Sequence, residues 1–201
     1  MVISGFQALK AHLQETEPVA AVVAAAHEEH TLEAVFQASQ DGLIRPIFVG
    51  RPEEISAIAC RLGQSIPEGD LVSAEDETAC AEKAVALIHQ GRGQMLIKGM
   101  LQTGTLLREV VRPETGIRAA PLLSHVAILD VPAYHKLLFL TDGGMVVAPD
   151  LEQKREILHN VLSLCRFLGY DMPKVAVLCA VETVSARMTE TEDAAQLKEE
   201  G

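Results

Sequence analysis

The chain has 201 residues, of which 48% are hydrophobic, enough to build buried cores for one large or two small domains. Only 3% of the residues are aromatic and none is Trp, which argues against a nucleic-acid platform of stacked rings and favours helices packed on aliphatic strands. The net charge of -11 also argues against nonspecific nucleic-acid binding.

The cysteines and the N-terminal segment indicate the cellular compartment. Cys60, Cys80, Cys165 and Cys179 are too few and too widely spaced for a disulfide framework or for a C-x-x-C site. No basic region leads into an apolar core at the start, and the longest apolar run, Val19–Ala26, is too short to cross a bilayer. We therefore expect a reduced, cytoplasmic protein that is neither exported nor inserted into a membrane.

The first half of the chain alternates short apolar runs with helical patterns, which is typical of β-α units that build a mainly parallel sheet. Strands are predicted over Val19–Ala25, Ile44–Val49, Leu71–Ser73 and Gln94–Ile97, and helices over His30–Ser39, Pro52–Leu62 and Glu75–Gln90. This half is therefore assigned to a first α/β domain, residues 1–117.

The segment from Arg112 to Pro121 interrupts this rhythm with two prolines and a glycine, and it predicts a domain boundary. The second α/β domain then covers residues 118–201, with Gly169 closing its long helix. Its predicted strands are Leu122–Leu129, Leu137–Leu140 and Lys174–Cys179, and its predicted helices are Leu151–Leu168 and Thr191–Glu199.

Charge is distributed unevenly along the chain. Between Gly91 and Lys136 six basic residues face three acidic ones, a local balance of +3 against -14 for the remainder. A basic middle in an acidic chain indicates either a site for an anionic small molecule or ordinary variation of a solvated surface.

The clearest candidate for an anion site is the β-α connection from Lys98 to Arg108. A strand ends at Lys98, two glycines including Gly104 let the backbone turn, and Thr103 or Thr105 is expected to cap a helix whose free N–H groups face the carboxyl end of that strand. Lys98, the threonines and Arg108 would then meet a phosphate from three directions. The alternative is a plain β-α loop with surface arginines.

Polar residues also end the strands of the second half. Ser124 and His125 are neighbours in an apolar run, so their side chains point to opposite faces and cannot form a nucleophile-base pair. Asp142 and Gly143 follow the next strand, where open α/β sheets bind ligands. The alternative is a turn that uses Asp and Gly for backbone reasons.

Metal and general-base chemistry find little support. The only tight histidine cluster, His27–His30, reads H-E-E-H and lacks the H-E-x-x-H spacing, so it is interpreted as the solvated start of a helix. Glu182 is interpreted as a helix-cap or polar-network residue rather than a base.

Short motifs follow one another in a fixed order along the chain: IFVG at Ile47–Gly50, KG at Lys98–Gly99, TGTLLR at Thr103–Arg108, LLSH at Leu122–His125, TDGG at Thr141–Gly144, PKVA at Pro173–Ala176, Glu182, and M-T-x-T-x-D-A at Met188–Ala194. This series resembles the phosphate acyltransferase family, which includes phosphate acetyltransferases and phosphate butyryltransferases, and it is most similar to the butyryltransferase branch.

The resemblance implies two three-layer α/β/α domains around mainly parallel sheets, with the active cleft between them. It implies transfer of a short acyl group between coenzyme A and inorganic phosphate, with coenzyme A as a substrate and with no metal and no permanently bound cofactor. It places Arg108 in the substrate cleft, and the Lys98–Thr105 loop, Ser124, Asp142 and the adjoining Gly143 near it. A homodimer or larger homo-oligomer is expected, with acyl-CoA, phosphate and acyl phosphate as its small-molecule partners.

Family sequences continue with D-G-P-L-A-x-D-N-A and S-R-x-D segments that carry the Ser and Asp of the reaction, and neither motif occurs here. The resemblance therefore predicts that both domains are incomplete, that this chain holds no catalytic residue, and that uncovered sheet edges promote self-association. The competing hypotheses are a coenzyme A-binding or partner-binding remnant without catalysis, and a regulatory domain like the C-terminal domain of malic enzymes. The preferred acyl group cannot be read from these residues.

Overall fold

The computed structural model describes residues 3–201, which form two compact units. Residues 9–119 make one unit, called here the sheet unit. Residues 3–8 and 120–201 make the other, called here the helical unit. Helix α1, Phe6–Leu13, spans the division between them and was not predicted from the sequence.

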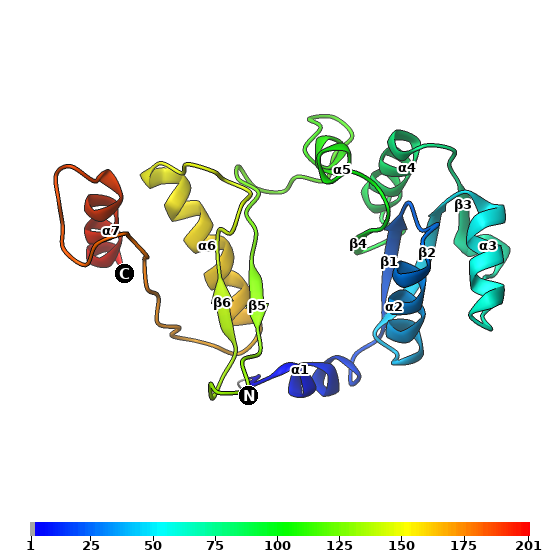
Figure 1. The fold of residues 1–201 in the computed structure, drawn as a ribbon, viewed down its shortest axis with the longest axis horizontal. Helices are drawn as coiled ribbons and strands as arrows, with labels where there is room; N and C mark the ends of the chain where they lie inside the picture. Colours follow the sequence, from blue (N-terminus) through cyan, green and yellow to red (C-terminus); the bar gives the residue numbers. More distant parts are fainter. Residues whose placement is uncertain (1–2) are drawn as a thin grey trace. The chain divides into compact units, whose positions relative to one another are not determined.

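The sheet unit is built on four parallel strands in the order β3-β2-β1-β4 (Figure 1). The strands are β1 (Val19–Ala24), β2 (Ile44–Gly50), β3 (Leu71–Ser73) and β4 (Met95–Lys98), and the helices are α2 (Glu29–Gln40), α3 (Pro52–Arg61), α4 (Glu77–His89) and α5 (Thr103–Val110), with a 3-10 turn at Glu68–Asp70. The α/β prediction for this half is confirmed, with element ends that differ by one or two residues.

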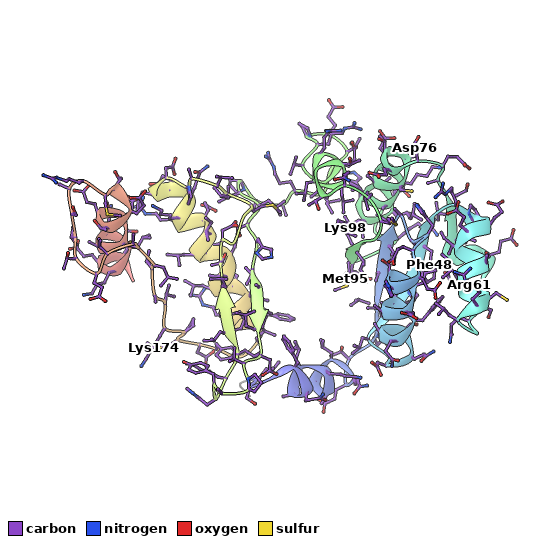
Figure 2. The ribbon with its side chains drawn as sticks, in the orientation of Figure 1. Phe48, Arg61, Asp76, Met95, Lys98 and Lys174 are labelled. Atoms are coloured by element: carbon purple, nitrogen blue, oxygen red, sulfur yellow. The ribbon has the colours of Figure 1, made fainter. Side chains whose placement is uncertain are left out.

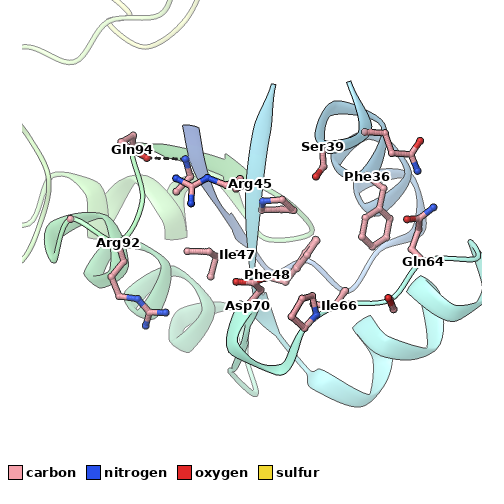
Figure 3. A pocket seen from close by; sticks show the side chains of 16 residues that line it. Phe36, Ser39, Arg45, Ile47, Phe48, Gln64, Ile66, Asp70, Arg92 and Gln94 are labelled. Atoms are coloured by element: carbon pink, nitrogen blue, oxygen red, sulfur yellow. Dashed lines mark hydrogen bonds between the residues drawn. The ribbon is translucent and has the colours of Figure 1, made fainter. Parts of the chain in front are cut away.

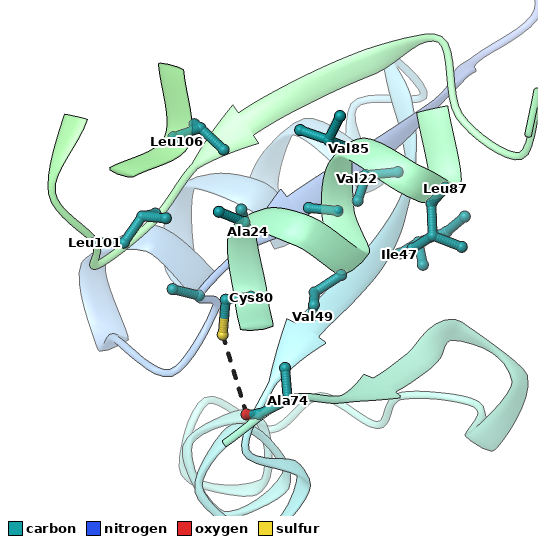
Figure 4. Packing of buried hydrophobic residues seen from close by; sticks show 13 residues of the cluster. Val22, Ala24, Ile47, Val49, Ala74, Cys80, Val85, Leu87, Leu101 and Leu106 are labelled. Carbon is teal, nitrogen blue, oxygen red and sulfur yellow. Dashed lines mark hydrogen bonds between the residues drawn. The ribbon is translucent and has the colours of Figure 1, made fainter. Parts of the chain in front are cut away.

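Two hydrophobic cores cover the two faces of this sheet. Successive side chains of a strand point to opposite faces. Accordingly, Val22 of β1 packs with α4 and α5, and Val23 packs with α2 and α3. Both valines are completely buried, which explains why β1 reads as a continuous apolar run. Figure 4 shows the first core, in which Val85 and Cys80 of α4 lie over β1 and β2.

The order of the strands creates a switch point at β1. The chain moves from β1 to β2 and β3 on one side, and then returns to place β4 on the other side of β1. In open α/β sheets the connections that follow two such strands leave the sheet in opposite directions, so a crevice opens at their carboxyl ends. This edge of the sheet unit therefore holds the candidate site.

The helical unit contains the antiparallel pair of β5 (Ala127–Leu129) and β6 (Leu138–Leu140), with helices α6 (Leu151–Phe167) and α7 (Thr189–Glu200). Asp150 and Gln153 form a capping box that starts α6. Gly169, with φ of 84°, follows its last turn, so the predicted helix end is confirmed.

Two strand predictions for the second half are wrong. The mainly parallel sheet is replaced by the antiparallel β5–β6 pair, and the strand expected over residues 122–129 is limited to β5. The stretch expected as a strand over residues 174–179 is coil, and Lys174 lies on this extended segment (Figure 2). Val175 is 51% and Leu178 79% exposed, because no strand of the described residues pairs with this stretch.

Within residues 3–201, the helices are too short or too polar to span a bilayer.

Candidate functional site

An open cavity of about 480 Å³ lies at the switch point of the sheet unit. Its walls come from the segments that follow β1 and β4 and from the first turn of α4. The lining residues are Glu28, Thr31, Glu77, Lys98, Gly99, Met100, Leu101 and Gln102. The volume is within the range of small-molecule sites. We call it the switch-point cavity.

The backbone beside this cavity is strained where β1 ends. Ala25 has φ of 56°, a left-handed conformation that costs a non-glycine residue roughly 1–2 kcal/mol. Its carbonyl oxygen accepts a hydrogen bond from the N–H of Met100 at 2.9 Å, and the next residue, Ala26, donates to Val49 O at 3.0 Å. Strained residues that the surrounding structure holds in place cluster at ligand sites, so this outlier favours a functional edge.

Gly99 is required by the close approach of β4 to β1. A Cβ atom at Gly99 would lie 2.4 Å from the Ala25 carbonyl oxygen and 2.7 Å from that of Ala24, and both are fixed backbone atoms. The N–H of Gly99 also donates to Ala24 O at 2.8 Å. The sequence indicated a tight turn here, and the structure gives its cause.

Lys98 is directed back onto its own loop. Its Nζ donates to Gly99 O at 3.2 Å and to Leu101 O at 3.1 Å, which holds the wall of the cavity in a fixed shape. An ammonium group has three donors. One N–H of Lys98 is therefore left for a ligand in the cavity.

The cap prediction for α5 is wrong. The N-cap is Gln102, and its N–H donates to the carboxylate of Glu77 at 3.0 Å, so neither Thr103 nor Thr105 caps the helix. Thr105 N donates to Gln102 O at 3.0 Å. Among the described residues, the N–H groups of Thr103 and Gly104 have no acceptor, as expected in a helix's first turn. These two donors remain for an anion.

The two arginines of the predicted motif have different surroundings. Arg108 is exposed and makes no ion pair within residues 3–201. Arg112 lies 2.9 Å from Glu109 and 3.5 Å from Glu82, which ties α5 to α4. Glu109 is only 4% exposed, and sequence reasoning missed it because its neighbours predicted a surface position. Only Arg108 is available to a ligand.

The His27–His30 cluster does begin a helix, with Glu28 as its N-cap, accepting from the N–H groups of His30 and Thr31. His27 differs from the predicted solvated residue, because its Nδ1 atom is buried without a partner in the described structure. Burial, followed by the charge of Arg51, lowers the pKa of His27. A Cβ atom at Gly50 would lie 2.9 Å from that Nδ1, so the imidazole needs a glycine beneath it. No group of three or more potential metal ligands occurs in residues 3–201.

In the helical unit, Ser124 is bound to α6. Its Oγ accepts a hydrogen bond from Asn160 Nδ2 at 2.9 Å, and the same amide group lies 3.4 Å from Leu122 O. Ser124 is thus hydrogen-bonded to an amide and not to an imidazole or a carboxylate. This arrangement orients the serine but does not activate it as a nucleophile.

Asp142 organises the loop after β6. Its Oδ1 accepts from Gly144 N at 2.8 Å and from Met145 N at 2.7 Å, and its Oδ2 accepts from His125 N at 3.0 Å. Partial burial acts to raise the pKa of the Asp142 carboxyl, but these N–H donors outweigh it and the net pKa is lowered. Gly143 passes over the His125 ring, where a Cβ would lie 3.3 Å from Nδ1. The turn interpretation of Asp142 is confirmed.

Glu182 is exposed and lies in coil, and it makes no hydrogen bond within the described residues. The N-cap of α7 is Met188. The interpretation of Glu182 as a cap or polar-network residue is therefore wrong. It rested on a strand that does not form.

Comparisons with known proteins agree on one family. The family model described as phosphate acetyl/butaryl transferase matches residues 68–200. A phosphate butyryltransferase of Clostridium acetobutylicum is 35% identical over 196 residues, which are 98% of this chain and 65% of the relative. A phosphate acetyltransferase of Rhizobium meliloti is 38% identical over 194 residues, 96% of this chain and 61% of the relative. The chain thus spans less than two thirds of the length of these relatives.

Solved structures give the same picture. A branched-chain phosphotransacylase from Enterococcus faecalis V583 matches with a TM-score of 0.74 at 28% identity, over 90% of this chain and 63% of that one. A phosphotransacetylase from Streptococcus pyogenes matches with a TM-score of 0.74 at 16% identity, over 97% of this chain and 70% of that one, which supports a shared fold.

Proposed function

The chain belongs to the phosphate acetyl/butyryl transferase family, and from this premise we propose that it supplies the substrate-binding part of an enzyme that converts acyl-CoA and phosphate to acyl phosphate and coenzyme A. The proposed acyl group is short, such as butyryl. In this reaction a phosphate oxygen attacks the thioester carbonyl, and the coenzyme A thiolate leaves. The protein must bring two anions together and stabilise a tetrahedral oxyanion.

We assign the anion-binding role to the carboxyl edge of the sheet unit. Lys98 offers one N–H in the switch-point cavity, and the first turn of α5 offers the N–H groups of Thr103 and Gly104. Arg108 lies further along the same helix and offers a guanidinium that makes no ion pair within residues 3–201. Backbone N–H groups and a guanidinium are the donors that phosphates prefer. Thr105 adds a hydroxyl on the same turn.

The observation that carries this proposal is the position of the switch-point cavity. Family membership alone is compatible with many arrangements of the substrate. The cavity, the strained Ala25 and the close packing of Gly99 coincide at the one edge of this sheet where its topology opens a crevice. For Ser124, Asp142 and Gly143 we propose a contribution to substrate binding through the shape of their loops.

The binding test is calorimetric titration of the 201-residue chain with coenzyme A and with inorganic phosphate. We expect saturable binding, and Arg108→Gln is expected to raise the Kd about tenfold or more because a charge-assisted hydrogen bond is lost. Arg118→Gln is the matched control, since Arg118 is also exposed in the sheet unit and makes no ion pair within residues 3–201, but it lies outside α5 and the Lys98–Gln102 loop. Equal affinity of both variants would refute the assignment of Arg108.

Turnover is tested by following release of the coenzyme A thiol from butyryl-CoA or acetyl-CoA when phosphate is added. We expect little turnover, because the hydroxyl of Ser124 is held by an amide and no described residue is arranged as its base. Binding without turnover is therefore the expected result, and the second candidate function, a coenzyme A-binding protein without catalysis, would give the same result. Robust turnover by this chain would contradict the expectation that the reacting groups lie elsewhere.

A further inference from the structure

A second cavity, of about 520 Å³, lies at the amino-terminal edge of the sheet unit. It is lined by the first residues of β1 and β2, the last turn of α2, the connection from α3 to β3, and the turn before β4 (Figure 3). This is the edge opposite the carboxyl ends of the strands, so none of its residues belongs to the switch-point cavity. We call it the amino-edge cavity.

One end of the amino-edge cavity carries two arginines. Arg45 follows the first residue of β2, and its Nε donates to Pro18 O at 3.3 Å, which fixes the guanidinium at the rim. Ala20, its register partner on β1, exchanges two hydrogen bonds of 2.8 Å with Gln94. That exchange holds the turn before β4 against β1, and Arg92 of this turn lies at the same end of the cavity as Arg45 (Figure 3). Arg92 makes no ion pair in the part of the chain that the structure describes.

The other end is apolar with neutral polar groups. Phe36 and the buried Phe48 pack at a centroid distance of 5.6 Å, and Ile66 lies beside them. Figure 3 shows Ser39 and Gln64 at this end. Asp70 lies between the two ends, so the lining changes from cationic through acidic to apolar along the cavity.

We propose that the amino-edge cavity binds a nucleoside monophosphate, which has the same sequence of chemical groups. Arg45 and Arg92 hold the phosphate from two sides, since guanidinium groups bind phosphate oxygens in pairs. Asp70 accepts hydrogen bonds from ribose hydroxyls, the usual role of a carboxylate at a ribose. The base lies against Phe36 and Ile66, within reach of the amide of Gln64.

The volume and the distribution of charge support this ligand over a simple anion. A lone phosphate would occupy only the end with the two arginines and would leave Asp70 and the apolar end without a ligand group. A neutral nucleoside would leave both arginines without a partner. The adenosine phosphate part of coenzyme A has the same chemical groups as a free nucleotide. Coenzyme A differs because its pantetheine arm must also find room beside the cavity.

The test is a titration of the 15N-labelled chain with AMP, followed by amide chemical shifts. Expected are saturable shifts at Ile66, Asp70 and the turn from Gly91 to Gln94, with a Kd of about 1 mM or tighter. Adenosine and inorganic phosphate are each expected to bind about tenfold more weakly or not at all. If coenzyme A shifts the same amides with the same Kd as AMP, the cavity binds the adenosine phosphate part of coenzyme A.

Arg92→Gln is expected to raise the Kd for AMP about tenfold, because it removes one of the two proposed arginine contacts to the phosphate. Arg92 is exposed and makes no ion pair in the described residues, so its loss should not destabilise the fold. Arg118→Gln, an exposed arginine that lines neither cavity, is the control and should leave AMP binding unchanged. Asp70→Asn should reduce the preference for AMP over 2′-deoxy-AMP. The proposal is overturned if AMP shifts only Lys98–Gln102, if no saturable shift appears, or if Arg92→Gln and Arg118→Gln behave alike.

Discussion

Two apolar stretches that were both predicted as strands have opposite fates in this molecule. Residues 19–24 read VAAVVA and form β1, with Ala21–Ala24 completely buried between two other strands and two layers of helices. Residues 174–179 read KVAVLC and remain an exposed coil in the helical unit. An apolar run becomes a strand only where neighbouring strands satisfy its backbone and helices cover its side chains. The two units therefore differ in whether such a run has partner strands.

The largest expected effect tests whether the sheet unit depends on the contact between β1 and β4. Gly99→Ala places a methyl group 2.4 Å from the Ala25 carbonyl oxygen, so the strands must separate. We expect the unfolding free energy of the sheet unit to fall by about 3 kcal/mol, measured by urea denaturation.

Gly104→Ala is the matched control, because a Cβ at that helical position meets no atom within 4 Å. It should stabilise the unit by about 0.5–1 kcal/mol, since alanine favours a helix more than glycine does. If both variants were equally stable, the close approach would not hold the sheet together.

A pair of identical substitutions sharpens the comparison between the two stretches. Val23→Ala removes two methyl groups from a completely buried site, and we expect a loss of about 2–3 kcal/mol in unfolding free energy. Val175→Ala removes the same groups from a side chain that is 51% exposed, and a change within about 0.5 kcal/mol is expected. A large loss at Val175 would show that residues 174–179 pack in solution.

The smallest expected effect is a dependence of stability on pH through His27. Burial and the charge of Arg51 lower its pKa in the folded state below the reference value of 6.5. The folded state therefore binds this proton less readily than the unfolded chain does. The contribution of neutral His27 to the free energy of unfolding is therefore complete above pH 6.5. It is lost as the pH falls below 6.5 towards the lower pKa of the folded state.

The measurement is urea denaturation at about pH 7.5 and about pH 5, with His27→Asn as the comparison. Asparagine keeps a polar atom near the position of Nδ1 but does not titrate. The variant should lose less stability than the parent over this interval. An identical pH dependence of both proteins would mean that His27 does not contribute.

The fold of the sheet unit could be predicted because its signals are local. Alternating apolar runs and helix caps such as Asp76 act within a few residues and are visible in the sequence. The helical unit was predicted less well, because the strand expected at residues 174–179 needs a partner strand, and pairing with a distant segment cannot be seen in the local sequence. The antiparallel direction of the β5–β6 pair was missed for the same reason.

The candidate site shows the same division. Lys98 and Gly99 were found because a strand end followed by glycine marks a β-α turn. The strain at Ala25, the capping carboxylate of Glu77 and the buried Glu109 were missed, because each depends on a contact with a different segment of the chain. The buried Nδ1 of His27 likewise depends on Gly50, a residue 23 positions later in the sequence.

The hydrogen bonds of Lys98 have a chemical consequence for the proposed binding of activated acyl groups. Acyl phosphates and thioesters react with amines, and an amine attacks only through a free lone pair. Lys98 Nζ donates to Gly99 O and Leu101 O, which directs the nitrogen towards its own loop. The loop that forms the wall of the switch-point cavity thus restrains the approach of its own lysine to a bound acyl group.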